Sequence, residues 1–226
     1  MTPDDKVLEY FYTIISENKQ EMYDQIASDR TRYITVVMEN IMKDHNASAV
    51  LRTCDCFGIQ DLHAIEKNQV YEVQRDIARG ADSWVDVYSH IHGESPSIEC
   101  LKKLKAKGYK IVSTSPHANM EISDIPIDHP IALVFGTEYH GISKEVEGFS
   151  DHTVSIPMYG FTESFNISVS AALALNILRS RLEKSGLKWK LKYEEQVKLK
   201  IQWCTTIIRN GKNVEHEIRK RIFEKE

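Results

Sequence analysis

Short apolar segments of strand-like composition alternate with helix-like segments along most of the chain. The expected strands cover residues 34–38, 61–65, 84–88, 110–114, 131–135 and 153–156. Helices fit between them, one of them at residues 46–56 and the clearest at residues 97–107 and 168–182. Asn46 is a good N-cap for the first of these helices, and Gly58 is placed to end it. The alternation predicts an α/β domain built around a largely parallel sheet.

Both ends of the chain carry helical patterns outside this alternation. Apolar residues recur at helical spacing in residues 3–26, which predicts an N-terminal amphipathic helix or pair of helices. Two more apolar stripes run through residues 193–208 and 214–222, with a break at Asn210-Gly211 between them. Each stripe needs a partner surface, so we interpret the tail as a helical appendage. The expected organisation is a helical extension over residues 1–30, an α/β domain over 31–182 and a helical extension over 183–226.

The charge of the chain is unevenly distributed. The net charge is −4, but residues 179–226 hold 14 Lys and Arg against 7 Asp and Glu. A basic tail on an acidic body is expected if the tail meets phosphate groups. The alternative is a solvated helix face, which on charge alone is the more common explanation.

Membrane, export and metal-binding functions find little support in the sequence. The longest apolar runs are only a few residues, whereas a membrane span needs about 20, and the first residues lack the features of a secretory signal. Cys54, Cys56, Cys100 and Cys204 are scattered, as reduced intracellular thiols are. Cys54 and Cys56 would point to different faces of a helix, and no paired Cys or His cluster follows them. We therefore expect a cytoplasmic protein with no membrane partner and no metal.

The phosphate-binding and nucleophile loops that many α/β enzymes use are absent from the sequence. No G-x-G-x-x-G follows an expected strand, and neither G-x-x-x-x-G-K-[ST] nor G-x-S-x-G occurs. Dinucleotide-binding, P-loop and α/β-hydrolase chemistries are therefore disfavoured.

Three other stretches follow expected strands, at the edge where open α/β sheets bind ligands. Residues 43–52 place polar groups at a helix start and an arginine, Arg52, in its second turn. Residues 135–141 set two glycines around Glu138. Residues 155–166 leave a strand, cross a Gly-containing loop and enter a helix of small residues. Taken singly, they are explained equally well by a surface charge, a turn and a tightly packed helix.

Together, the three stretches resemble the three motifs of the SpoU-type branch of the SPOUT methyltransferases, over about residues 30–182. The third stretch is closest to its family form, I-P-M-x-G-x-x-x-S-L-N-V-S, with Phe165 and Ile167 as apolar replacements. The first matches K-P-H-N-x-S-A-x-x-R-T, with Asp44 in place of the proline. Residues 51–55 and Ser83-Trp84 further resemble the tRNA guanosine-18 2′-O-methyltransferase subgroup, which also has helical extensions at both ends.

The resemblance implies a fold and a methyl donor. The family's α/β sheet threads its C-terminal part into a deep trefoil knot, which composition and periodicity would not suggest. The knot loops of the family hold S-adenosylmethionine (S-adenosyl-L-methionine). By position, the donor would be framed by Thr114, Gly136, Ile156, Met158 and Phe165.

The resemblance also implies the catalytic residues for methyl transfer to a ribose 2′-oxygen. The family gives the central role to the arginine that matches Arg52. A guanidinium has a pKa above about 12, so we expect Arg52 to stabilise the developing alkoxide and not to act as a base. Asn46 and Glu138 would orient Arg52 and the ribose, while Ser164 and Asn166 would shape the knot loop.

The expected substrate is tRNA, at guanosine 18 of the D-loop, and the expected assembly is a homodimer whose sites are completed by the partner chain. The N-terminal extension is acidic where those of the subgroup are often basic, so RNA contacts are expected from Arg30, Arg32, His45 and the tail. Three alternatives remain: the same chemistry on ribosomal RNA, the same chemistry on the tRNA wobble nucleotide, or a non-catalytic RNA-binding paralogue. The paralogue predicts loss of the arginine or asparagine, and both are present.

Overall fold

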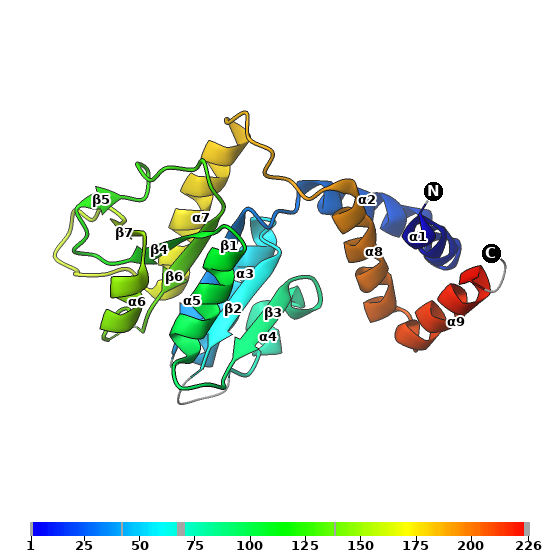
Figure 1. Cartoon of the computed structure of the whole chain (residues 1–226), viewed down its shortest axis with the longest axis horizontal. Helices are drawn as coiled ribbons and strands as arrows, with labels where there is room; N and C mark the ends of the chain where they lie inside the picture. Colours follow the sequence, from blue (N-terminus) through cyan, green and yellow to red (C-terminus); the bar gives the residue numbers. More distant parts are fainter. Residues whose placement is uncertain (1, 42, 67–70, 138, 224–226) are drawn as a thin grey trace. The chain divides into compact units, whose positions relative to one another are not determined.

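The computed structural model describes residues 2–41, 43–66, 71–137 and 139–223. They form two compact units, an α/β unit of residues 31–189 and a helical unit of residues 1–30 with 190–226. The helical unit therefore joins both ends of the chain (Figure 1).

The α/β unit is organised around one parallel sheet. Its strands, in the described part of the chain, are β1 (Ile34–Glu39), β2 (Asp61–Ile65), β3 (Asp86–His90), β4 (Lys110–Thr114), β5 (Met120–Glu121), β6 (Ile131–Phe135) and β7 (His152–Ser155). Their order is β3-β2-β1-β6-β4-β7-β5, and every pair is parallel. The predicted α/β class with a parallel sheet is confirmed. The third strand begins two residues later than predicted, because a short 3-10 helix, η1 (Ala81–Ser83), precedes it.

Helices cover both faces of this sheet, as a parallel sheet requires. They are α3 (Asp44–Cys56), α4 (Arg75–Ala78), α5 (Pro96–Ala106), α6 (Lys144–Phe149) and α7 (Ile167–Glu183). Val36 of β1 belongs to the core shared with α3 and α7, whereas its neighbour Val37 belongs to the core shared with α5 and α6. Successive residues of a strand point to opposite faces, so the fully buried β1 supplies both cores.

The start of α3 corrects one prediction. Helix α3 begins at Asp44 with Lys43 as its N-cap, so Asn46 lies inside the first turn and is not the cap. The predicted end of this helix is confirmed, because Gly58 follows the last turn with a φ of 69°, a left-handed conformation that glycine adopts easily.

The helical unit contains α1 (Pro3–Ile14), α2 (Glu17–Asp29), α8 (Tyr193–Ile207) and α9 (Gly211–Phe223). Helix α1 packs against α8 and α9, and α2 packs against α8, so the two apolar stripes of the tail find their partner surface in the N-terminal helices. Phe11, Tyr23 and Trp203 are buried at the centre, with the Tyr23 and Trp203 rings 5.3 Å apart edge to face. Among the described residues, no helix is both long and apolar enough to span a membrane.

Arg32 ties together the N-terminal ends of β2 and β3. Its guanidinium pairs with Asp61 and, at 2.9 Å, with Asp86. Asp61 is only 8% exposed, and burial raises the pKa of its carboxyl although Arg32 and Lys107 act to lower it. A buried carboxylate of this kind depends on its cation to remain ionised.

We expect Arg32→Gln to lower the free energy of unfolding by about 2 kcal/mol, because the buried Asp61 carboxylate then lacks the guanidinium that pairs with it. Thermal or urea denaturation would measure the change. Lys102→Gln is the matched control, since Lys102 is exposed on α5 and should be nearly neutral. Equal stability of the two variants would show that the Arg32 pairs contribute nothing.

Candidate active site

The three stretches singled out in the sequence converge at the carboxyl ends of the parallel strands. The first follows β1, the second follows β6 and the third follows β7. Strands β1 and β6 are neighbours in the sheet, and β4 lies between β6 and β7. Because all the strands run the same way, these stretches meet along one edge, where open α/β sheets bind ligands.

A hydrogen bond joins the first stretch to the third. The side-chain amide of Asn166 donates to Oδ1 of Asn46 at 3.1 Å. Oδ1 of Asn166 also accepts from the backbone N–H of Ser168 at 2.9 Å and from the Ser168 hydroxyl, so Asn166 caps α7. Asn46 is 3% exposed. The contact fixes the start of α7 against the start of α3, although 120 residues separate the two asparagines.

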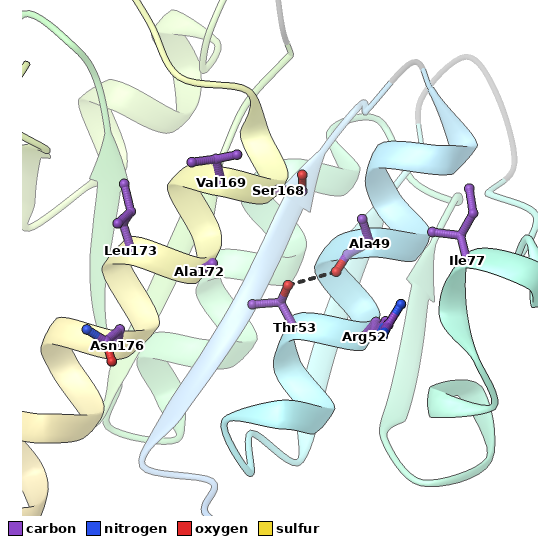
Figure 2. A pocket seen from close by; sticks show the side chains of 9 residues that line it. All are labelled: Ala49, Arg52, Thr53, Ile77, Ser168, Val169, Ala172, Leu173 and Asn176. Atoms are coloured by element: carbon purple, nitrogen blue, oxygen red, sulfur yellow. Dashed lines mark hydrogen bonds between the residues drawn. The ribbon is translucent and has the colours of Figure 1, made fainter.

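A groove lies between α3 and α7 just beyond this contact (Figure 2). Its lining residues are Ala49, Arg52, Thr53, Ile77, Ser168, Val169, Ala172, Leu173 and Asn176. Arg52 is the cation in this otherwise neutral lining, and it is exposed. No hydrogen bond or ion pair to it comes from the described residues, so its guanidinium is available to a ligand within that part of the chain. Glu138, which we expected to orient Arg52, lies outside the described residues.

The turn after β6 is tightly closed. Thr137 and Gly141 exchange two backbone hydrogen bonds, of 2.8 and 3.0 Å. A Cβ atom on Gly136 would lie 2.1 Å from the carbonyl carbon of Gly141. Position 136 therefore requires glycine, because the backbone of Gly141 and Ile142 occupies the space that a side chain would need.

The residues expected to frame the methyl donor follow three adjacent strands. Thr114 ends β4, where its hydroxyl donates to the carbonyl of Val134 at 3.0 Å. Gly136 follows β6, while Ile156 and Met158 follow β7 and are half-buried. Phe165 is 40% exposed, and Ser164 is exposed near the end of the same loop. The strand order β6-β4-β7 brings Thr114, Gly136 and Ile156 to neighbouring places at the carboxyl edge of the sheet.

Glu39, which the sequence analysis did not single out, holds the second stretch in place. It is 3% exposed at the end of β1. Its carboxylate accepts from the backbone N–H of Ser143 at 2.9 Å, from the Ser143 hydroxyl at 2.8 Å and from the Ser97 hydroxyl at 2.9 Å. The signal in the sequence is an acidic residue at the end of a mostly apolar strand.

Two of the three residues expected to contact RNA are engaged within the protein. Arg30 is 2% exposed, and its guanidinium lies 5.6 Å from the centre of the Trp203 ring. Arg32 holds Asp61 and Asp86. His45 is exposed in the first turn of α3. Of the three, His45 is thus the side chain presented to solvent beside the candidate site.

Comparison with known proteins finds the same family by sequence and by structure. The SpoU rRNA Methylase family model matches residues 33–176. The tRNA (guanosine(18)-2′-O)-methyltransferase of Borreliella burgdorferi is 34% identical over 205 residues, which cover 90% of this chain and 92% of that protein. The enzyme of the same name from Thermus thermophilus is 30% identical over 173 residues, covering 76% and 87%.

A solved structure shares most of the fold. The A. aeolicus TrmH/SpoU tRNA modifying enzyme matches with a TM-score of 0.76 and 26% identity, over 85% of this chain and 98% of that one. The 205 residues aligned with the Borreliella burgdorferi protein exceed the length of the α/β unit. That similarity therefore extends into the helical unit.

Proposed function

Because this chain belongs to the SpoU rRNA Methylase family, we propose that it transfers a methyl group from S-adenosylmethionine to a ribose 2′-hydroxyl of tRNA, at guanosine 18. The observation that carries the proposal is the hydrogen bond from Asn166 to Asn46, which holds the first and third motifs together beside Arg52. The choice of tRNA rests on the relatives named above, whose likeness reaches beyond the α/β unit.

The chain's own groups suit the proposed donor. Ile156 and Met158 offer half-buried apolar surface after β7, and the backbone of Gly136 lies at the same edge of the sheet. A neutral adenine and a short thioether arm bind well to backbone hydrogen-bonding groups and small apolar walls. When bound, the donor would supply an electrophilic methyl group on a sulfonium. Thr114 and Phe165 would complete its frame.

In the proposed mechanism, Arg52 stabilises negative charge on the ribose 2′-oxygen as that oxygen attacks and its proton passes to solvent. A guanidinium stays protonated at any working pH, so its contribution is hydrogen bonding and charge. Asn46, held by Asn166, keeps the first turn of α3 in place. Glu138 would orient Arg52 and the ribose, and Ser164 would shape the loop that faces them. Correct placement matters because an in-line displacement needs close approach of the reacting atoms.

We expect Arg52→Lys to lower kcat by about 100-fold, because lysine keeps the charge but loses the planar fork of donors. Methylation of tRNA transcripts with labelled donor would measure this, while calorimetry would show unchanged donor affinity. Arg75→Lys on α4 is the control, since Arg75 is exposed and outside the site. Near-normal turnover of Arg52→Lys would remove Arg52 from the mechanism.

The substrate assignment predicts where methyl groups disappear in cells. Deleting the gene should remove the 2′-O-methyl group from guanosine 18 of tRNA and leave ribosomal RNA unchanged, as mapping of 2′-O-methyl positions would show. Loss from ribosomal RNA alone, or from the tRNA wobble nucleotide, would replace the assignment by one of these alternatives. An unchanged map, together with no activity of the purified protein, would favour a non-catalytic RNA-binding role.

The trefoil knot belongs to the same proposal. The segment between β4 and β6 forms a loop beside β7, and α7, which follows β7, packs on that loop: Arg181 donates to the carbonyls of Ile122 and Ile125. A chain that passes through its own loop would account for this packing.

Pulling the α/β unit by its ends in optical tweezers should give a stretched length shorter than that of an unknotted chain. A stretched length equal to that of an unknotted chain would exclude a knot.

A homodimer is proposed from the exposed apolar face of α7. Val169 and Leu173 are 43% and 36% exposed on this helix, beside Arg52 in the groove. Burial of this face against a second copy would also complete the site.

We expect Leu173→Glu to convert a dimer to a monomer, as light scattering would show, because it puts a charge on the apolar face. Tyr159→Glu, on the exposed loop, is the control and should not change the assembly. A dimeric Leu173→Glu protein would place the interface elsewhere.

A further inference from the structure

Three potential metal ligands meet on the α5 face of the sheet. His63 comes from β2, His90 from the end of β3 and Cys100 from α5. Nδ1 of His63 lies 2.9 Å from Nε2 of His90, and the ligand atoms of all three residues lie within 4.8 Å of one another. None of the three has a part in the proposed methyl transfer.

The backbone arrangement explains why these side chains converge. Residue 65 of β2 is the register partner of His90, and residue 63 is the partner of Tyr88. Residues two apart on a strand point to the same face, and Ile65 belongs to the same core as Cys100. His63 and His90 therefore point toward α5, with the His63 ring stacked on Tyr88 at 4.9 Å and on His90 at 5.2 Å.

The donor set of two imidazoles and one thiol suits Zn²⁺. Zinc binds nitrogen at about 2.0–2.1 Å and sulfur at about 2.3 Å, so tetrahedral ligand atoms lie roughly 3.3–3.6 Å apart. The two nitrogens are slightly closer than this, at 2.9 Å, and no two of the three ligand atoms are more than 4.8 Å apart. Small side-chain rotations would complete the geometry.

The surroundings favour neutral imidazoles. Burial, with smaller contributions from His90 and Lys107, lowers the pKa of His63 to about 3, and burial and Lys103 lower that of His90. Neutral imidazole is the form that binds metal. Burial raises the pKa of the Cys100 thiol to about 12, against the effect of Lys103 and Lys107, so a bound ion would displace that proton.

The cluster is closed on one side and reachable on the other. His63 and Cys100 are 6% and 1% exposed, whereas His90 is half-buried on β3, an edge strand of the sheet. Both oxygens of the neighbouring Glu66 are occupied, by the backbone N–H of Tyr71 and by the Ser89 hydroxyl. Water is therefore the natural fourth ligand, entering past His90.

We propose that His63, His90 and Cys100 bind a Zn²⁺ ion that fastens the edge strand β3 and helix α5 to β2. Cys100 lies one turn after Ser97, whose hydroxyl donates to Glu39. The ion would thus stabilise α5, the helix whose Ser97 contacts Glu39. Glu39 in turn accepts hydrogen bonds from Ser143. Without an ion, the two imidazoles share a hydrogen bond with each other, and the experiment separates these two states.

The test uses the full chain after treatment with a chelator. Titration with Zn²⁺ should show a saturable site of one ion per chain and a rise in melting temperature, because an ion that binds only the folded state stabilises it. Replacement by Co²⁺ should give the near-ultraviolet absorption of a sulfur–cobalt bond. His90→Gln and Cys100→Ala should each weaken zinc binding by at least about tenfold and abolish the rise in melting temperature. Cys100→Ala should also abolish the absorption of the sulfur–cobalt bond.

Two matched variants serve as controls. His92→Gln changes an exposed histidine two residues away, and Cys54→Ala changes a buried cysteine on α3; both should bind zinc as the unaltered protein does. Should Cys100→Ala fold poorly without metal, His90→Gln alone decides, since His90 is half-buried. Absence of a saturable site, or equal binding by His90→Gln, would overturn the proposal in favour of a hydrogen-bonded histidine pair.

Discussion

The insertion of β6 between β1 and β4 is the constraint on which the rest of the α/β unit depends. Ile131 starts both registers, opposite Ile34 on one side and Lys110 on the other. All five residues of β6 are buried, so the strand packs apolar side chains on both faces and is stable only at the centre of the sheet. That position puts Gly136 between the ends of β1 and β4. The three motifs meet because this strand is central.

Buried polar contacts then fix the loops that leave this edge. Glu39 and Asn46 are each 3% exposed, and burying such groups is unfavourable unless they are hydrogen-bonded. Glu39 is satisfied by Ser97 and Ser143, and Asn46 by Asn166. Each partner belongs to a segment that follows or supports a different strand. A loop that moved away would leave a buried oxygen unsatisfied, so these contacts select one arrangement of the edge.

The sequence predicts features that depend on neighbouring residues, such as strands and helices. It does not predict contacts that depend on how distant segments align in the sheet. Apolar runs indicate strands such as β1 and β6 because these strands are buried along their whole length, whereas the two residues of β5 are too short to show a pattern. The local sequence indicates a helix cap at Asn46 because its true partner, Asn166, is 120 residues away. The cluster of His63, His90 and Cys100 has no zinc-like spacing, since only the β2 and β3 register brings its members together.

The charge that the tail presents also depends on contacts between distant residues. The acidic N-terminal extension and the basic tail lie at opposite ends of the sequence, yet they pack into one helical unit. Within it, Lys200 pairs with Asp24, Lys190 with Asp29 and Arg219 with Asp4. Each pair removes a cation from the charge that the tail can offer to phosphate, so the excess of Lys and Arg in the sequence overstates its attraction for RNA. The acidic N-terminal helices are therefore complementary in charge to the basic tail. This pairing explains why they are acidic, and the explanation requires no contact with RNA.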